Sequence, residues 1–231
     1  MNHSDEFRKY ATKHIGINSI ALHDYEKAAN SRLFMPKAMT PSVIEERQMN
    51  AVIMSVFDRL MMDRIIFLGM GINDMVANVI NAQLLYLESI DDKKAIQIFI
   101  NSPGGSVYDG LGVYDTMQYI KPKIATVNTG MAASMAFVLM VAGEKGHRTS
   151  LPHARFMQHQ PMGGAQGQAS DIQIVAREID KLKTELYEII SKHTGQTMEK
   201  VTADCDRDYW MTAKEAQEYG CIDIIPPSKK K

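Results

Sequence analysis

The chain has 231 residues, of which 45% are apolar and 23% are charged, so it can build one good-sized core and is not a disordered protein. Its net charge of −1 excludes the basic surface that nucleic acid would require, and its two cysteines exclude a disulfide framework and favour a reducing, cytoplasmic compartment. The strongly apolar part of the longest uncharged stretch, residues 135–142, is far shorter than the roughly 20 residues of a membrane span.

The N-terminal region differs from the rest of the chain. Residues 1–40 are polar and irregular in pattern, and we expect a leader or removable pro-segment there; a small helical extension is the alternative. From Ser42 to Met62 the apolar residues fall at helical spacing, which predicts a helix.

Strands and helices then alternate along the chain. Strands are expected at residues 64–69, 95–100, 123–127, 147–150, 155–159 and 222–225, and helices at 74–90, 106–120 and 132–142. Three successive strand–helix units predict a parallel sheet with right-handed crossovers.

A long amphipathic helix is predicted over residues 171–193, with Ser170 as its N-cap and Gly195 at its end. A capping box, Thr212 to Glu215, opens a short helix that Gly220 closes. Residues 226–231 are a tail.

Two turns are candidates for chemistry. Gly104-Gly105 lies between a strand and a helix, where exposed N–H groups suit an anion or oxyanion; a plain tight turn is the ordinary alternative, and no nucleotide-binding motif follows it. Ser134 begins an apolar helix, where a serine is usually an N-cap or packing residue but can also be a nucleophile backed by the helix N-terminus.

A serine nucleophile needs a base. His159 ends a strand just before the segment Gln160 to Gly164 and is favoured among the histidines, whereas His193 is expected to be a solvated cation at a helix C-terminus. The spacing of the histidines matches no metal site. Spacing leaves the third member of a triad open among the aspartates Asp171, Asp204, Asp206, Asp208 and Asp223.

Four motifs in order along the chain resemble those of the ClpP family of ATP-dependent caseinolytic serine proteases. They are Asn101–Ser106, Gly130–Met135, Met157–Gln168 and Asp206–Asp208. The resemblance covers about residues 41–225 and implies one peptidase domain there. The implied α/β fold is a crotonase-like ββα spiral, with the helix over 171–193 as a protruding handle.

The resemblance also implies roles for individual residues. The catalytic residues would be Ser134 as nucleophile, His159 as general base and Asp208 as the group that orients the imidazole. Gly105 and Met135 would supply the N–H groups of the oxyanion hole, and Met162, Gly163 and Gly164 would bind an extended substrate. No metal or cofactor is implied.

The partners that the resemblance implies are other copies of the chain in a double heptameric ring, unfolded polypeptide substrates, and a hexameric AAA+ Clp ATPase that uses the ATP. Two departures concern gating and docking: residues 50–53 read Asn-Ala-Val-Ile where the family commonly has Gly-Glu-Arg-Ser, and Gln97 replaces a common aromatic residue. The alternatives are a crotonase-type acyl-CoA enzyme and a non-catalytic ring subunit.

Overall fold

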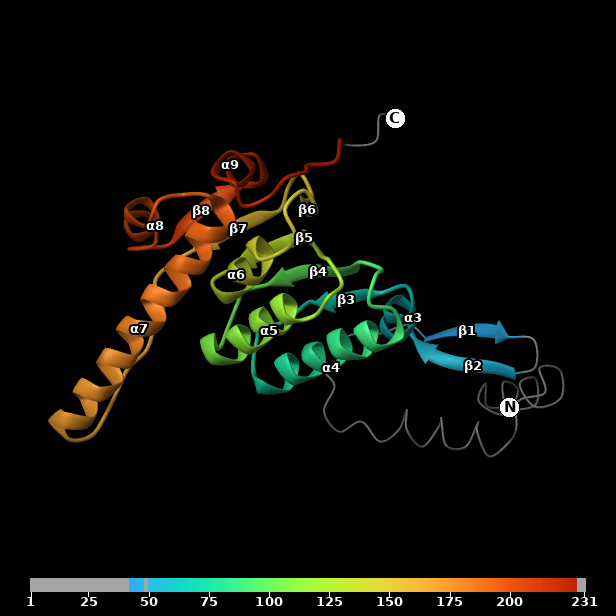
Figure 1. Ribbon diagram of the computed structural model, residues 1–231, viewed down its shortest axis with the longest axis horizontal. Coiled ribbons are helices and arrows are strands. Elements are labelled where there is room, and N and C mark those ends of the chain that lie inside the picture. The colour runs from blue at the N-terminus through green and yellow to red at the C-terminus, as the bar shows by residue number, and fades with distance from the viewer. Residues whose placement is uncertain (1–41, 48–49, 228–231) are drawn as a thin grey trace, which may run out of the picture. The chain divides into compact units, whose positions relative to one another are not determined.

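The computed structural model describes residues 42–47 and 50–227, in two units divided after Asp63 (Figure 1). The expected leader, residues 1–40, lies outside the described residues. In the first unit, strands β1 (Ser42–Arg47) and β2 (Asn50–Ser55) pair antiparallel and helix α3 (Val56–Met62) follows them.

The helix expected over residues 42–62 is therefore wrong for residues 42–55. Several of its apolar residues are β-branched, which suits a strand, and in the register of the two strands Ile44 is paired with Ile53. Residues 48 and 49, between the two strands in the sequence, are neither glycine nor proline, so the sequence lacks the usual hairpin signal. The helix begins only after Ser55, whose side chain forms a capping box with Asp58.

The second unit contains a six-stranded sheet in the order β3-β4-β5-β7-β8, with β6 also paired to β5. The strands are β3 (Ile65–Leu68), β4 (Ile96–Ser102), β5 (Ile124–Ala133), β6 (Arg148–Ser150), β7 (Arg155–Gln158) and β8 (Tyr209–Thr212). All neighbours are parallel except β7 and β8, so the predicted parallel sheet is confirmed.

The strand expected over residues 222–225 is wrong. Ile224 makes one isolated bridge to Thr149, and the adjacent Asp223 turns its carboxylate to Arg148. The antiparallel strand β8 and the short helix α8 were not predicted, because both are too short for a clear periodicity.

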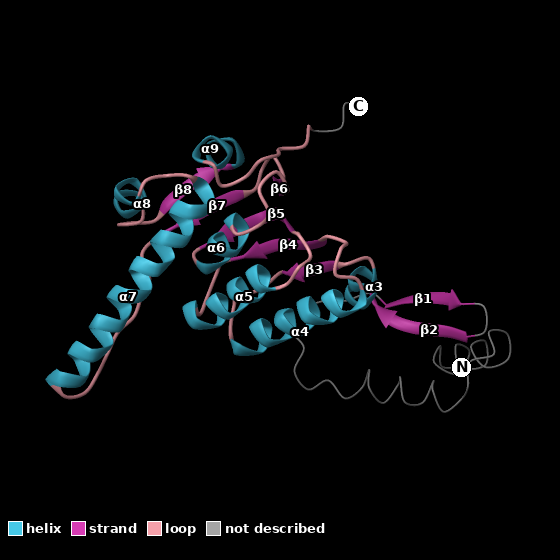
Figure 2. Ribbon diagram, in the orientation of Figure 1, coloured by secondary structure: helices cyan, strands magenta, loops and turns pink. Residues whose placement is uncertain are grey.

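Helices pack against this sheet (Figure 2). They are α4 (Asp74–Ile90), α5 (Val107–Tyr119), α6 (Met135–Val141), α7 (Ala169–Thr194), α8 (Met198–Asp204) and α9 (Ala213–Tyr219). Helix α4 lies beside α5, and α5 lies beside α6. Every residue of α6 is buried, so the element that follows Ser134 lies in the centre of the core.

The long helix α7 projects from this unit (Figure 1). Residues 169–177 are exposed, whereas its second half is anchored by buried residues such as Leu186 and Ile190. Gly195 ends the helix in the left-handed conformation, as predicted. Ser170 is not the N-cap: the helix begins at Ala169, two residues earlier than expected, after Gln168, which makes no side-chain cap.

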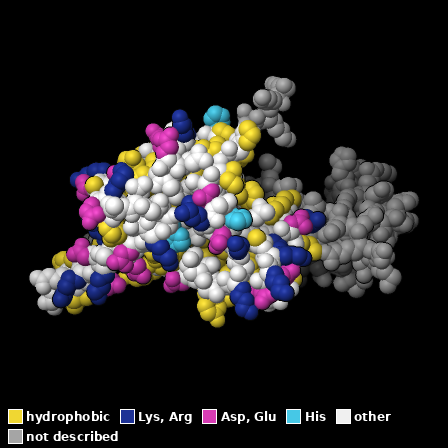
Figure 3. All heavy atoms as spheres, turned by 45° about the horizontal axis from the view of Figure 1, so that its top comes forward, with side chains coloured by type: hydrophobic (Ala, Val, Ile, Leu, Met, Phe, Trp, Pro, Cys, Tyr) yellow, Lys and Arg dark blue, Asp and Glu magenta, His cyan; other side chains and the backbone are white. Residues whose placement is uncertain are grey.

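Neither a membrane-spanning helix nor a face of one charge sign is seen in the described residues as Figure 3 presents them. No helix among residues 42–47 and 50–227 is long and apolar enough to cross a membrane. On the face in Figure 3, acidic and basic side chains are interspersed rather than gathered by sign.

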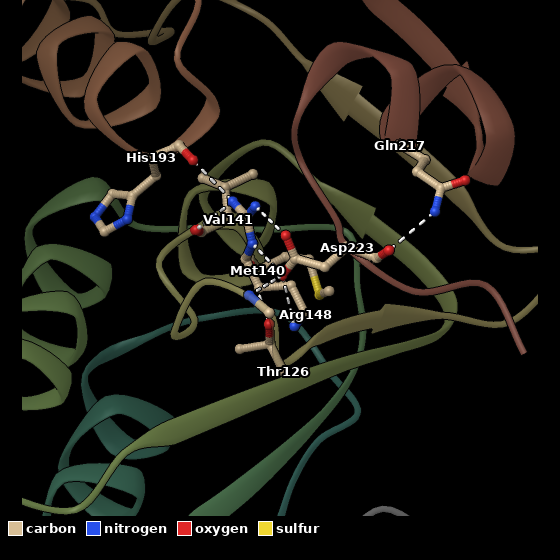
Figure 4. Close-up of polar contacts among 8 residues, drawn as sticks. Thr126, Met140, Val141, Arg148, His193, Gln217 and Asp223 are labelled. Carbon is tan, nitrogen blue, oxygen red and sulfur yellow. Dashed lines mark hydrogen bonds and ion pairs between the residues drawn. The ribbon is translucent and has the colours of Figure 1, made fainter.

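A buried ion pair joins the C-terminal segment to the sheet (Figure 4). The Arg148 guanidinium donates to both carboxylate oxygens of Asp223, at 2.9 and 2.7 Å, and to the backbone carbonyl of His193, at 2.8 Å. Burial alone would raise the pKa of Asp223, but the hydrogen bonds and charge of Arg148 outweigh it and hold that pKa below its usual value. The pair therefore connects β6, the end of α7 and the chain after α9.

His193 is not the solvated cation that its place at a helix end predicts. Its ring is half-buried and lies 3.1 Å from the Tyr114 hydroxyl. Burial, followed by the charges of Lys192 and Arg148, lowers the pKa of His193 to about 4, so the ring is neutral at pH 7.

We predict that Asp223→Ala lowers the free energy of unfolding by about 3 kcal/mol or more, because it leaves the Arg148 charge buried without its partner. Urea unfolding at fixed protein concentration measures the loss. Asp92→Ala, which removes an exposed ion pair with Lys121, is the control and should cost at most about 1 kcal/mol.

The same experiment has a pH signature. Because the folded-state pKa of Asp223 lies below its unfolded value of about 4, its contribution is present above pH 4 and is lost as the pH falls through the folded-state pKa. The difference between wild type and Asp223→Ala should therefore shrink in acid. A difference that stays constant down to pH 2 would contradict this assignment.

Candidate active site

Ser134 occupies a strained turn between β5 and α6. Its backbone has φ 54° and ψ −124°, a region that residues other than glycine rarely adopt. Although Ser134 stands at the N-cap position, its side chain makes no capping hydrogen bond. Instead its Oγ lies 2.9 Å from Nε2 of His159, so the ordinary reading of an N-cap serine does not apply.

His159 is brought to Ser134 by the register of two strands. Ala133 on β5 is paired with Met157 on β7, and the Ser134 N–H donates to the Met157 carbonyl at 2.9 Å. Strands β5 and β7 are parallel, so the residues that follow their last pair lie at the same end of the sheet. The side chains of Ser134 and His159 therefore meet there. The His159 side chain is 11% exposed, so the imidazole is largely shielded from water.

Asp208 meets the other ring nitrogen of His159. Its Oδ1 lies 3.0 Å from Nδ1, and the antiparallel pairing of Gln158 with Tyr209 places the two residues just beyond the end of the β7–β8 ladder. A carboxylate only accepts hydrogen bonds, so Nδ1 carries the proton of the neutral ring and Nε2 is free to accept from the serine hydroxyl.

The other candidate aspartates have different partners or places. Asp204 binds Lys200 and Tyr219, Asp223 binds Arg148, Asp206 lies 4.0 Å from Arg207, and Asp171 lies in the first turn of α7. The structure therefore brings Asp208 alone of the five to His159.

Gly104 lies directly against the Ser134 turn, and the next residue, Gly105, lies against Ile72. A Cβ on Gly104 would come within 2.6 Å of the Ala133 carbonyl oxygen and 2.7 Å of Ser134 Cβ, and a Cβ on Gly105 would overlap Ile72. The Gly104 N–H is occupied by Ser102 Oγ at 3.1 Å. Gly105 and Met135, the first residue of α6, are the N–H groups next to the serine that sequence analysis assigned to an oxyanion.

Two residues that sequence reasoning gave no role support this turn. The side chain of Ser102 is fully buried and fixes Gly104, and Asn101 Oδ1 accepts the Met131 N–H at 3.1 Å. Both belong to the Asn101–Ser106 motif, so the signal was present, but their roles depend on hydrogen bonds, to Gly104 and to Met131 of β5, that spacing does not reveal.

A small apolar pocket borders Ser134 and His159. The apolar side chains that line it are Val107, Met135, Phe137, Val138, Pro161, Leu186 and Ile190. Next to it, Met162, Gly163 and Gly164 are exposed and belong to no strand or helix, and Met162 is 84% exposed. This stretch leaves its backbone available beside the pocket.

The two cysteines are unsuited to act as nucleophiles. Cys205 and Cys221 are both buried, burial raises the pKa of Cys205 to about 12, and it raises that of Cys221 as well, so both thiols are protonated and weakly nucleophilic. Among the described residues, no group of three or more His, Cys, Asp or Glu side chains is arranged to hold a metal ion.

Comparison with known proteins agrees with this geometry. The Clp protease family model matches residues 47–229. A protein of Bacteroides fragilis (strain YCH46) called ATP-dependent Clp protease proteolytic subunit is 63% identical over 96% of this chain and 98% of its own length. One of the same name from Porphyromonas gingivalis is 61% identical over 98% of this chain and its full length, and subunit 1 of that protease from Salinibacter ruber is 51% identical over 81% of this chain and 80% of its own.

The chain belongs to the Clp protease family. The expectations of the family's α/β fold and of a serine-type peptidase are thereby confirmed. The acyl-CoA enzyme considered from the sequence is set aside, because the similarity to Clp proteases covers nearly the whole chain.

We predict that Gly104→Ala lowers kcat for a short fluorogenic peptide by roughly a hundredfold, because the new methyl group must displace the Ser134 turn and small misplacements of catalytic groups are that costly. The control is Gly146→Ala, which also has a positive φ of 88° but no atom within 4 Å of the new Cβ. A loss of kcat in Gly146→Ala as large as that in Gly104→Ala would show that backbone strain, and not the contact with Ser134, is responsible.

Proposed function

We propose that this chain is a serine endopeptidase subunit in which Ser134 is the nucleophile, His159 the general base and Asp208 the group that orients the imidazole. The observation that carries the proposal is the continuous chain of contacts from Ser134 Oγ through both nitrogens of His159 to Asp208, at 2.9 and 3.0 Å.

The reaction follows from these contacts. His159 takes the hydroxyl proton as Ser134 Oγ attacks the peptide carbonyl, and the imidazolium then gives that proton to the leaving amine, which leaves an acyl-enzyme. Water, activated by the same imidazole, attacks the acyl-enzyme and releases the new carboxyl end. Asp208 stabilises the imidazolium in both steps.

The oxyanion of each tetrahedral intermediate is bound by the N–H groups of Gly105 and Met135. Gly105 follows Gly104, which lies against the Ser134 turn, and Met135 begins α6, whose N-terminal dipole favours negative charge. Both donors are held in place before substrate binds, because α6 is buried along its whole length and Gly105 is bridged to Ile72.

The substrate binds as an extended strand along Met162, Gly163 and Gly164, with one side chain in the apolar pocket beside Ser134. Unpaired backbone in this stretch supports such strand addition, in which main-chain hydrogen bonds supply affinity without requiring a particular sequence. Unfolded polypeptide is therefore the substrate class.

The assembly is a double heptameric ring of this chain that encloses the active sites, fed by a hexameric AAA+ Clp ATPase in the cytoplasm. Exposed apolar residues on the projecting part of α7, Ile172, Ile174 and Val175, support burial against another copy. The relatives are named as subunits of an ATP-dependent protease, and this chain has no nucleotide-binding motif, so the ATP is used by the partner and no cofactor is needed here.

Docking of the ATPase involves a surface that departs from the family pattern at Gln97. This residue is exposed on β4, two residues before Phe99, whose ring stacks on Phe67 at 6.1 Å between centroids. The two aromatic rings leave an apolar surface next to the polar Gln97. Residues 50–53, the second departure, lie on β2.

We predict that Ser134→Ala abolishes peptide hydrolysis, with a loss of roughly 10³-fold or more, while the native elution volume is unchanged. Asp208→Asn should be severely impaired as well, because the imidazole loses its charge partner and preferred tautomer. A fluorophosphonate probe that labels wild type but not Ser134→Ala excludes a non-catalytic ring subunit. Near-normal hydrolysis by purified Ser134→Ala would rule out this nucleophile.

Wild type and Ser134→Ala also test whether the N-terminal leader is removed. We propose that residues 1 to about 37 are removed by the peptidase itself, which leaves an N-terminus near Ala38, because a long extension would crowd the axial entrance of the ring. Intact-mass spectrometry should give a shortened wild type and a full-length Ser134→Ala. A full-length mass for active wild type would contradict the processing, and a shortened mutant would mean that another protease cuts.

We predict that the chain alone cleaves short peptides but leaves a stably folded protein intact, because a chamber with narrow entrances excludes folded substrates. Gel analysis of a folded substrate, with and without a Clp ATPase and ATP, measures this. Degradation of the folded protein without the ATPase would contradict the enclosed chamber. Absence of peptide hydrolysis would contradict the proposed active site.

A further inference from the structure

The position of Asp208 needs an explanation, because its side chain lies mostly at the surface of the part of the chain that the structure describes. Its side chain is 61% exposed, and one hydrogen bond to an exposed carboxylate holds its partners only weakly. Pairing between β7 and β8 ends at Gln158 and Tyr209, so His159 and Asp208 both lie just outside the ladder. Other contacts must keep the segment before Asp208 in place.

Contacts of Gln160 provide part of this support, on one side of His159. The Gln160 N–H donates to the Cys205 carbonyl at 2.7 Å, and its Nε2 donates to the Asp206 carbonyl at 2.9 Å. Both acceptors belong to the chain that leads from α8 to Asp208.

A buried side-chain relay provides the support on the other side of His159. Gln158 Nε2 donates to the Tyr219 hydroxyl at 3.1 Å, and that hydroxyl donates to Asp204 Oδ2 at 2.8 Å. Lys200 Nζ also donates to Asp204 Oδ2, at 2.9 Å. Gln158 and Tyr219 are only 1% and 6% exposed, so these bonds are shielded from competing water.

The hydroxyl of Tyr219 links two segments of the chain, because it accepts a hydrogen bond from Gln158 and donates one to Asp204. Burial, reinforced by the Asp204 carboxylate, raises the pKa of Tyr219, which keeps the donating proton in place. Phenylalanine fills the same space but can make neither bond.

We propose that Gln158, Tyr219 and Asp204 are positioning residues for catalysis: their relay fixes the segment that carries Asp208 so that its carboxylate reaches His159 Nδ1. The inference rests on the proposed function, and it adds residues that touch neither substrate nor the reacting atoms. It assigns Asp204, one of the candidate triad carboxylates from the sequence, a supporting place behind the triad.

The test is a double-mutant cycle on kcat. Tyr219→Phe should lower kcat for a short peptide roughly tenfold to a hundredfold with KM within about twofold, because the catalytic geometry loosens while the substrate contacts remain. If Tyr219 acts through Asp208, adding Tyr219→Phe to Asp208→Ala should change the residual kcat less than twofold. The same tenfold loss in both backgrounds would overturn the inference.

Tyr114→Phe is the matched control. It also removes a buried tyrosine hydroxyl with one side-chain partner, His193, but that bond does not reach the segment before Asp208. Its melting temperature should fall about as much as that of Tyr219→Phe, while its kcat stays within about twofold of wild type. An equal loss of kcat in both variants would mean that loosening of the fold, not positioning, is responsible.

A second pair of variants tests the relay should Tyr219→Phe fail to fold. Asp204→Asn keeps an oxygen that accepts from Tyr219 and should retain most of kcat, whereas Asp204→Ala should lose about as much as expected for Tyr219→Phe. Equal activity of these two variants would overturn the relay. Wild-type activity that does not depend on Ser134 would overturn the proposed function itself, whereas Ser134-dependent activity that Tyr219→Phe leaves unchanged would overturn only this inference.

Discussion

The strained turn at Ser134 is the constraint on which the rest of the site depends. A serine at φ 54° is costly, and it persists because β5 and the fully buried α6 hold both of its ends. That conformation frees Oγ from capping and turns it to His159. It also explains why Gly104 must lack a side chain, since a Cβ there would strike the turn itself.

Strand register brings the other two side chains of the site, His159 and Asp208, to Ser134. Pairing of Ala133 with Met157 brings His159 to the serine, and pairing of Gln158 with Tyr209 brings Asp208 to the histidine. Three side chains from distant parts of the chain thus meet because β7 lies between β5 and β8 in the sheet. A one-residue slip in either ladder would turn His159 or Asp208 to the opposite face.

Local signals account for what the sequence predicts well. The capping box from Thr212 to Glu215, the left-handed Gly195 and the long helix before it depend on neighbouring residues and appear as expected. The β1–β2 hairpin was mistaken for a helix because its apolar spacing suits both structures and its turn has no glycine. Spacing left five aspartates as candidates because the choice of Asp208 depends on the pairing of β7 with β8, and the resemblance chose it by motif.

The carboxylates of Asp223 and Asp208 serve different purposes, as their burial shows. Asp223 faces the almost fully buried Arg148, so its charge is matched in a region where an unpaired charge would be very costly, and that pair stabilises the fold. Asp208 is mostly exposed, so its pairing with His159 adds little to stability. The value of an exposed carboxylate there lies in the direction and tautomer that it imposes on the imidazole, which requires accurate placement of the backbone rather than burial. For that reason the buried polar contacts of this region lie behind Asp208, at Gln158 and Tyr219, and not on Asp208 itself.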